Sequence, residues 1–244
     1  RELQNRGGGL FGSNPLTGSI GVVTINLPRL GFTSKTKIDF FNKLSALMDI
    51  ASESLEIKRK FLEISTERGI YPYAKYYLQD IYKRDRQYWR NHFSTIGLVG
   101  GNECCLNFLG KDISTAEGKE FIREILLFMR EKIRSYQEKT GNLYNLESTP
   151  AEGASYRLAR LDKKYFPMIT AAGNGIPFYT NSTQLPVNYS TDIFQALEHQ
   201  DDLQTLYTGG TVFHIFLREE LPNINAVKNI VRKVTNSYKL PYFT

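Results

Sequence analysis

Two nearly continuous runs of apolar residues constrain the fold of this chain more than any other feature. They cover residues 20–27 (Ile-Gly-Val-Val-Thr-Ile-Asn-Leu) and 92–101 (His-Phe-Ser-Thr-Ile-Gly-Leu-Val-Gly-Gly). Runs of this kind, rich in β-branched residues, are typical of strands that are buried on both faces of a sheet. We therefore expect both segments to be interior strands, the first ended by Pro28 and the second by a glycine turn.

Helical periodicity separates these two strands. Apolar residues recur at helical spacing over residues 37–68, which predicts a long helix with at most one break. Gly69 follows this pattern and is expected to act as the C-cap. A charged and tyrosine-rich connector over residues 71–90 then leads to the second strand.

The rest of the chain is predicted to continue this alternation with shorter elements. A capping box formed by Ser114 and Glu117 opens a helix that Gly141 stops. Strands are expected at residues 143–147, 178–182 and 211–217, and helices at 150–162 and 225–238. Because strands alternate with helices, the sequence predicts an α/β fold, with mostly parallel strands and outer helices. Neither a repeat nor a low-complexity linker divides the chain, so residues 1–244 are expected to form one domain.

The charge balance favours a small ligand that carries phosphate over a polynucleotide. Lys and Arg number 31 against 25 Asp and Glu, and the net charge of +6 is spread along the chain. Aromatic residues that alternate with Lys or Arg are not evident, so nucleic acid is not expected as a partner. No apolar stretch approaches the roughly 18 to 20 residues that span a bilayer, and no secretory signal opens the chain. We therefore expect a cytoplasmic protein without membrane contact.

The two cysteines, Cys104 and Cys105, are adjacent in sequence. Neighbouring residues rarely meet disulfide geometry, and two thiols with three scattered histidines do not provide the spacing of a metal site. The sequence therefore predicts a reducing compartment and no metal within this segment. Both thiols are expected to pack as small apolar side chains, because no sequence-adjacent His or Lys activates them.

The most informative local motif covers residues 142–157, where a predicted strand leads into a helix. Thr149 is placed to cap this helix, Pro150 takes its first position and Glu152 closes a capping box. A helix start of this kind can bind phosphate through its free N–H groups and its macrodipole. Gly153 keeps the first turn small enough for a ligand, whereas the Glu152 carboxylate would repel a polyphosphate. The residues alone leave both a capped structural helix and an anion site open.

Other polar residues lie beside the predicted strands. Asn102 and Glu103 follow the second strand, at the end where α/β proteins commonly bind ligands. Asn181 and Ser182 belong to a run of hydrogen-bonding side chains over residues 179–185, which either lines a pocket or forms a turn. The glycines near the N-terminus precede a strand and lack the lysine of a phosphate loop, so they predict a flexible loop.

Five motifs resemble successive motifs of one enzyme family. They are Gly-Ser-Ile-Gly-Val-Val-Thr-Ile-Asn-Leu-Pro-Arg at 18–29, Phe-Ser-Thr-Ile-Gly-Leu-Val-Gly at 93–100, Asn-Leu-Tyr-Asn-Leu-Glu with Thr-Pro-Ala-Glu-Gly at 142–153, Tyr-Thr-Asn-Ser at 179–182 and Thr-Gly-Gly-Thr-Val-Phe-His at 208–214. The family is that of the anaerobic, class III ribonucleoside-triphosphate reductases. Each motif alone is weak, but the five fall in the family's order and span nearly all of the chain, which makes the resemblance specific.

The resemblance implies a fold and a chemistry. The family's catalytic domain is a ten-stranded α/β barrel of the glycyl-radical enzyme type, and this segment resembles its second half, with residues 7–18 as the return limb of a finger loop. In the family, a glycyl radical oxidises a finger-loop cysteine to a thiyl, and the ribonucleotide then loses its 2′-hydroxyl. Formate or a thiol system supplies the reducing equivalents. The resemblance places the thiyl cysteine before Arg1, and the zinc cysteines and the radical glycine after Thr244, so no catalytic residue is expected within this segment.

The resemblance also implies candidate residues for binding the substrate. The preferred site for the substrate phosphates is the helix start made of Thr149, Pro150, Ala151, Glu152 and Gly153. Many relatives carry an asparagine near the substrate ribose where this chain has Ser19, which makes Ser19 a weaker candidate. Asn102, Glu103, Asn181 and Ser182 are further candidates for the pocket.

The partners that the resemblance implies are a ribonucleoside triphosphate substrate, nucleotide effectors, a radical-SAM activating enzyme and a second copy in a homodimer. The corresponding role is the synthesis of deoxyribonucleotides for DNA replication. Two alternatives stay open. One is another glycyl-radical enzyme with a related barrel and a non-nucleotide substrate, and the other is a nucleotide-binding module without chemistry of its own.

Overall fold

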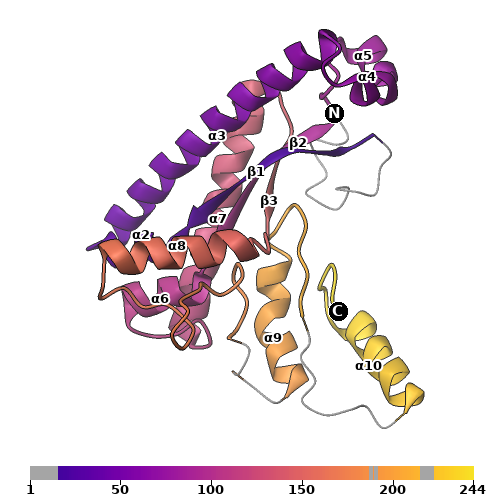
Figure 1. The fold of residues 1–244 in the computed structure, drawn as a ribbon. Coiled ribbons are helices and arrows are strands. Elements are labelled where there is room, and N and C mark those ends of the chain that lie inside the picture. The colour runs from indigo at the N-terminus through magenta and orange to yellow at the C-terminus, as the bar shows by residue number, and fades with distance from the viewer. Residues whose placement is uncertain (1–15, 187–188, 190–191, 215–222) are drawn as a thin grey trace.

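The computed structural model describes residues 16–186, 189, 192–214 and 223–244. In these residues, three strands run side by side, and long helices cover them (Figure 1). The return limb of the finger loop, expected at residues 7–18, falls mostly outside the described residues. The end of the strand expected at residues 211–217 falls outside them as well.

The strands form one parallel sheet in the order β1 (Gly18–Asn26), β2 (His92–Val99) and β3 (Tyr144–Glu147). The predicted α/β fold with parallel strands is confirmed, and these strands represent part of the expected barrel. All eight residues of β2 are buried, as predicted. The prediction of burial on both faces is wrong for β1, where Val22 is 47% exposed. Val22 is the register partner of Thr95 and lies on the face of the sheet opposite the main core.

The helix α3 (Lys37–Glu67) confirms the predicted long helix and has no break. Thr36 caps its first turn, because its side chain accepts a hydrogen bond from the Asp39 N–H at 3.1 Å. Beyond its last turn, Gly69 adopts a φ of 79°. That left-handed conformation favours glycine and explains why the helix ends there.

The helix α7 (Ala116–Thr140) lies beside α3 and packs against β3. Its N-cap is Thr115, whose hydroxyl accepts a hydrogen bond from the N–H three residues farther on. The predicted capping box is therefore wrong by one residue, because the Ser114 hydroxyl donates to the carboxylate of Asp112 instead. Gly141 stops α7 in the left-handed conformation, as predicted.

The main core lies between these two helices and one face of the sheet. Each large side chain that is fully buried there stabilises the fold by about 1.5 to 3 kcal/mol. The guanidinium of Arg59 crosses this interface and donates hydrogen bonds to the His92 carbonyl and the Ser94 hydroxyl, which ties α3 to β2. Fully buried core residues include Phe40, Leu44, Met48, Leu55, Ile96, Leu98, Ile122, Ile125 and Leu126.

Short helices occupy segments that the sequence presented as turns or connectors. The helix α2 (Leu27–Thr33) begins directly after β1, so Pro28 both ends a strand and lies in the first turn of a helix. The helices α4 (Pro72–Tyr77) and α5 (Gln79–Asp85) fill the predicted connector, at the far end of α3 in Figure 1. The helix α6 (Gly101–Leu109) follows β2.

Three helices follow the sheet in the chain. The helices α8 (Glu152–Tyr165) and α10 (Ile224–Ser237) lie close to their predicted bounds, whereas α9 (Ile193–Gln204) was not predicted. None of the helices in the described residues is long and apolar enough to cross a bilayer.

The strand predicted at residues 178–182 is wrong. The backbone of this segment is hydrogen-bonded to the turn after β2 instead. The Gly100 and Gly101 N–H groups donate to the carbonyls of Thr180 and Ser182, at 2.8 Å each. The described part of the strand predicted at residues 211–217 forms only an isolated bridge at Phe213.

Candidate functional site

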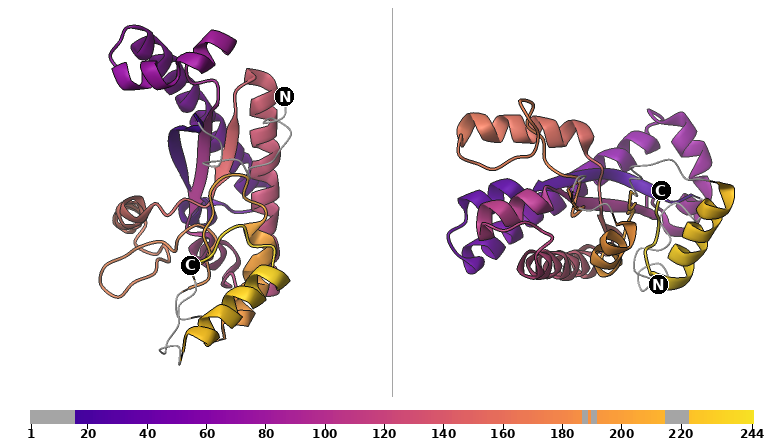
Figure 2. Two further views of the ribbon diagram at one scale, coloured as in Figure 1. Left: turned by 90° about the vertical axis from the view of Figure 1, so that its right-hand side faces the viewer. Right: turned by 90° about the horizontal axis from the view of Figure 1, so that it is seen from below.

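The sheet has one apolar face and one polar face. The apolar face, beneath α3 and α7, carries Ile25, Ile96, Leu98 and Leu146. On the other face, Thr24 of β1 is the register partner of Gly97 on β2, which is in turn the partner of Glu147 on β3. Thr95 and Asn145 are partners on the same face. Figure 2 shows α8 on the opposite side of the strands from α7. The face opposite α7 therefore carries hydroxyl, amide and carboxylate groups, of which those of Thr95 and Asn145 are buried.

Two residues of this polar face were missed by the sequence analysis. Asn145 is 1% exposed, and neither atom of its amide has a hydrogen-bond partner among the described residues. A buried polar group left unpaired costs about 1 to 3 kcal/mol, so this amide favours a ligand. Glu147 is half-buried, and burial raises the pKa of its carboxyl. The alternation of Tyr144 and Leu146 with these two residues was the signal that could have found them.

Thr149 lies against β2 and does not cap α8. Its side chain is buried, with its hydroxyl oxygen 3.5 Å from both the Leu98 carbonyl and the Thr24 hydroxyl. A Cβ at Gly97 would lie 2.5 Å from that oxygen. The absence of a side chain at Gly97 therefore allows this contact, and the predicted capping box of Thr149 and Glu152 is wrong.

The first turn of α8 is uncapped and open. Ala151 is the N-cap residue with a left-handed φ of 47°, and no side chain makes a cap hydrogen bond. Pro150 precedes the helix and does not take its first position. Glu152 is exposed, and a Cβ at Gly153 would meet nothing within 4 Å. An uncapped helix start with open space around its second residue is the geometry that anion binding requires.

A buried carboxylate holds α8 at the carboxyl-terminal end of β1. Asp162 is fully buried and accepts hydrogen bonds from the Asn26 amide at 2.7 Å, the Arg29 guanidinium at 2.6 Å and the Tyr179 hydroxyl at 2.7 Å. Burial and the bond to Asp162 raise the pKa of Tyr179, which therefore stays a donor. The sequence carried no sign of this cluster, because its members are distant in the chain.

Asn102 and Glu103 are buried in the first turn of α6 and bond to the protein itself. The Glu103 carboxylate accepts from the N–H and the hydroxyl of Thr180, at 2.9 and 2.7 Å. The Asn102 carbonyl oxygen accepts from the Ile113 N–H at 3.3 Å. The bonds of Glu103 hold the segment after α8 in place, and the bond of Asn102 holds the segment between α6 and α7. Ligand binding by either residue stays a prediction.

The structure brings some of the remaining candidates to the polar face. The Ser19 hydroxyl lies 2.8 Å from the Thr95 hydroxyl, near the amino-terminal end of β1. Ser182, with a φ of 41°, donates a hydrogen bond to the Thr149 carbonyl at 2.9 Å, and its oxygen lies 3.0 Å from the Asn181 side-chain carbonyl. Ser19 and the start of α8 therefore mark opposite ends of the polar face.

Cys104 and Cys105 are fully buried in α6 as free thiols. The backbone of Cys104 contacts α2 so closely that a Cβ at Gly31 would lie 2.7 Å from its carbonyl oxygen. Burial raises the pKa of both thiols, that of Cys105 to about 12. The two side chains lie in the main core, as the sequence predicts.

We expect neither thiol to react with iodoacetamide at pH 8 in the folded protein, because both are inaccessible and protonated. Both should react fully after unfolding in urea. Mass-spectrometric mapping of the peptide that contains Cys104 and Cys105 measures each state. Rapid labelling of either thiol before unfolding would contradict the packing role.

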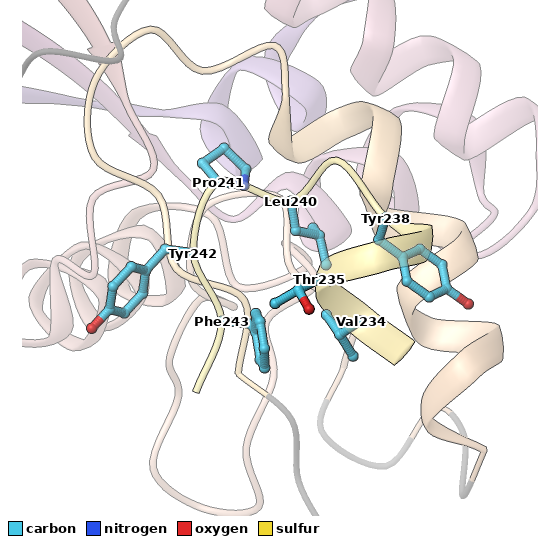
Figure 3. Close-up of a pocket in the computed structure, with 7 residues that line it drawn as sticks. All are labelled: Val234, Thr235, Tyr238, Leu240, Pro241, Tyr242 and Phe243. Carbon is cyan, nitrogen blue, oxygen red and sulfur yellow. The ribbon is translucent and has the colours of Figure 1, made fainter. Parts of the chain in front are cut away.

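A pocket lies among the last residues of the chain, and its chemistry differs from that of the start of α8. It encloses about 360 Å³ between the end of α10 and the residues that follow it (Figure 3). Its lining contains no charged side chain, so it does not match a phosphate ligand. The lining residues are Val234, Thr235, Tyr238, Leu240, Pro241, Tyr242 and Phe243.

Comparison with known sequences gives one consistent result. The family model described as anaerobic ribonucleoside-triphosphate reductase matches residues 2–244. The enzyme of that name from Haemophilus influenzae is 27% identical over 241 residues, which cover 92% of this chain and 32% of that protein. The enzyme of phage T4 is 28% identical over 229 residues, 87% of this chain and 35% of that protein. The chain thus spans about a third of the length of these relatives.

Solved structures show the same fold. An anaerobic ribonucleotide reductase matches 93% of this chain with a TM-score of 0.76 at 24% identity, over 35% of its own length. The Thermotoga maritima enzyme in complex with dATP and CTP matches with a TM-score of 0.73 at 24% identity, over 93% of this chain and 36% of its own. Together with the family match over nearly the whole sequence, the fold leaves one conclusion: this chain belongs to the anaerobic ribonucleoside-triphosphate reductase family.

Proposed function

We propose that this chain forms part of the nucleotide-binding wall of an enzyme that reduces ribonucleoside triphosphates to 2′-deoxyribonucleoside triphosphates. The observation that carries the proposal is the uncapped start of α8, which opens beside a polar sheet face. A triphosphate is the most highly charged part of such a substrate. The free N–H groups and the positive end of the α8 dipole provide a site for it.

The polar sheet face suits the ribose. Its hydroxyl, amide and carboxylate groups can exchange hydrogen bonds with sugar hydroxyls, and the unpaired amide of Asn145 lacks a partner until a ligand supplies one. Ser19 presents a hydroxyl where many relatives carry an amide, so it contributes a shorter side chain to the same face. Asn145 and Glu147 are the residues we add to the predicted site.

The radical chemistry is proposed to belong to other parts of the protein. The resemblance assigns the thiyl cysteine, the glycyl radical and the zinc ligands to positions outside this chain. Among the described residues, no group of three or more His, Cys, Asp or Glu side chains is arranged to hold a metal ion. The role of this chain is therefore to bind the substrate, to orient its ribose and to exclude water, with formate or a thiol as the external reductant.

The proposed partners follow from the family. Solved relatives from Thermotoga maritima contain dATP in a specificity site, or dATP together with CTP. We propose that the complete protein likewise binds a ribonucleoside triphosphate substrate and nucleotide effectors. Activation by a radical-SAM enzyme and assembly as a homodimer belong to the same proposal.

The experiment that tests the phosphate site is Gly153→Phe in the complete protein. We expect the dissociation constant of the ribonucleoside triphosphate to rise at least about tenfold, because the ring fills the open space at the helix start. Isothermal titration measures this constant. Glu152→Gln should instead tighten binding, since it removes an exposed negative charge beside the phosphates.

The matched control is Leu161→Phe, which adds a ring to an exposed position farther along the same helix. It should leave the dissociation constant unchanged. Equal constants for the Gly153 and Leu161 variants would show that the phosphates bind elsewhere.

A further inference from the structure

Residues 179–182, which we call the brace, connect the start of α8 to the turn that follows β2. On the side of α8, the Ser155 hydroxyl donates to the Tyr179 carbonyl at 2.6 Å and accepts from the Tyr179 N–H at 2.9 Å. The Ser182 hydroxyl donates to the Thr149 carbonyl at 2.9 Å. The brace therefore contacts the beginning of α8 on both sides of its N-cap.

The backbone beside these contacts is strained in both segments. Ala151, the N-cap of α8, has a φ of 47°, and Ser182 has a φ of 41°. Both values lie in the left-handed region, which is unfavourable for residues that carry a Cβ. Such conformations persist only where surrounding contacts fix them. The conformation at the start of α8 therefore depends on its neighbours, and the Ser182 bond is one of the contacts that fix it.

The first turn of α6 fixes the brace from the other side. The Glu103 carboxylate accepts hydrogen bonds from the N–H and the hydroxyl of Thr180, at 2.9 and 2.7 Å. A Cβ at Gly101 would lie 2.9 Å from the Ser182 carbonyl oxygen, so the brace lies directly against α6. Glu103 is thus joined to the start of α8 through Thr180, the brace backbone and Ser182.

The position of Glu103 suits a carboxylate that binds to the protein itself. Glu103 is 1% exposed, and its two oxygens accept from Thr180 and, at 3.3 Å, from the Asn102 amide. All of these donors are uncharged. A carboxylate accepts from every donor at once, whereas a glutamine would present an N–H group to one of them. Burying a charge costs free energy unless hydrogen bonds satisfy it, and both oxygens of Glu103 are already used.

We propose that Glu103 is a positioning residue, which fixes the start of α8 through the brace and does not contact the nucleotide. This role replaces the ligand contact that the resemblance suggests for Glu103. Its effect on nucleotide affinity rests on the proposed phosphate site at α8. Its effect on the conformation of α8 does not, so the two can fail separately.

Hydrogen exchange of the complete protein without nucleotide tests the path from Glu103 to α8. Glu103→Ala should increase amide exchange in residues 155–160 at least about fivefold, because the loss of one net hydrogen bond changes a local opening equilibrium by about that factor. Glu103→Gln should restore most of the protection, since its carbonyl still accepts from the Thr180 N–H and the Thr180 hydroxyl can turn to accept. If Glu103→Ala does not fold, Thr180→Val removes one of the same bonds with little change of shape.

The matched control is Asn107→Ala, one turn farther along α6. The Asn107 amide donates to the Thr170 carbonyl at 3.0 Å and accepts from the Thr170 N–H at 2.8 Å. This pair also joins α6 to the segment after α8, but Thr170 lies outside the brace. Asn107→Ala should therefore leave amide exchange in residues 155–160 unchanged.

The affinity for CTP, which a solved relative from Thermotoga maritima binds together with dATP, measures the consequence for the proposed site. Glu103→Ala and Ser182→Ala should each raise the dissociation constant at least about fivefold. The double variant should exceed the larger single effect by no more than about twofold, because both changes interrupt one path. Two independent effects would instead multiply to about 25-fold.

Unchanged exchange in residues 155–160 of a folded Glu103→Ala or Thr180→Val protein would overturn the proposal. An equal increase in Asn107→Ala, or independent effects of Glu103→Ala and Ser182→Ala on affinity, would overturn it as well. Increased exchange in Glu103→Ala with CTP affinity unchanged, both there and in Gly153→Phe, would confirm the path to α8 and reject the phosphate site.

Discussion

Asp162→Ala is expected to lower the free energy of unfolding by about 3 kcal/mol or more. The Asp162 carboxylate is fully buried and accepts hydrogen bonds from three side chains. Its removal leaves the Asn26 amide and the Tyr179 hydroxyl without an acceptor, and each unpaired group costs about 1 to 3 kcal/mol. The Arg29 guanidinium is partly exposed, so water can hydrate it after the ion pair is lost, and this loss adds little to the destabilisation. The two unpaired hydrogen-bonding groups, and not the lost ion pair, therefore account for most of the expected loss of stability.

Urea denaturation of the wild-type and variant proteins measures this loss. The control is Asp202→Ala, which removes the ion pair between Asp202 and Lys119. The Asp202 side chain is 55% exposed. It should cost less than about 1 kcal/mol. If both variants lost the same stability, the cluster around Asp162 would not hold α8 in place. A variant that folds at low temperature should also bind nucleotide more weakly, because α8 would no longer be fixed to β1.

The elements that the sequence predicts well are those with a long apolar pattern. β2 and α3 each bury one continuous set of apolar residues in the main core, so burial follows directly from the pattern. The helix α9 was missed for the converse reason. Its buried side includes Gln200 and Gln204, which bond to Thr183 and to each other. A pattern of apolar residues cannot reveal a core position that is filled by a paired amide.

The starts of helices were predicted less accurately than their existence. Ser114 and Thr115 are adjacent hydroxyl residues, and a third group, the Asp112 carboxylate, decides which of them caps α7. Thr149 illustrates a longer-range effect. It lies against β2 because Gly97 has no side chain, and the chain needs two more residues before α8 begins. Such competition is set by tertiary contacts, which local sequence does not contain.

The chemistry of the site was predicted only in part. The open start of α8 lies where the motif at 149–153 suggests, although the predicted cap is absent. The polar sheet face was not predicted, because the apolar runs were interpreted as buried on both sides. Thr95 and Gly97 interrupt that run at every second position, and their significance depends on Asn145 and Glu147 in the neighbouring strand. The register between β2 and β3 places these four residues side by side, and the sequence alone does not specify that register.

Glu147→Gln is expected to have opposite effects on stability and on activity. Burial raises the pKa of this carboxyl above its ordinary value of 4.5. A carboxyl with a higher pKa in the folded state binds its proton more tightly there, so ionisation destabilises the fold. This destabilisation is absent at pH values below the pKa of the carboxyl in the unfolded state, and it is fully present at pH values above its pKa in the folded state. The Gln variant should therefore melt at a higher temperature than the wild type at pH 7, and the difference should vanish as the pH falls below 4.5.

If the complete protein has the proposed reductase activity, the same variant should lower that activity about 10²-fold or more. A positioned carboxylate that exchanges a proton or a charged hydrogen bond with a ribose hydroxyl contributes at least that much. Nucleotide affinity should change little, since the proposed phosphate site lies at α8 and not at Glu147. The matched control is Glu131→Gln on the exposed side of α7, which should alter neither melting nor turnover. A residue that serves only the fold cannot gain stability and lose turnover through one substitution that keeps its shape. Full activity in a more stable Gln variant would therefore exclude Glu147 from the site, and lower stability at pH 7 would show that a partner satisfies its charge in the complete protein.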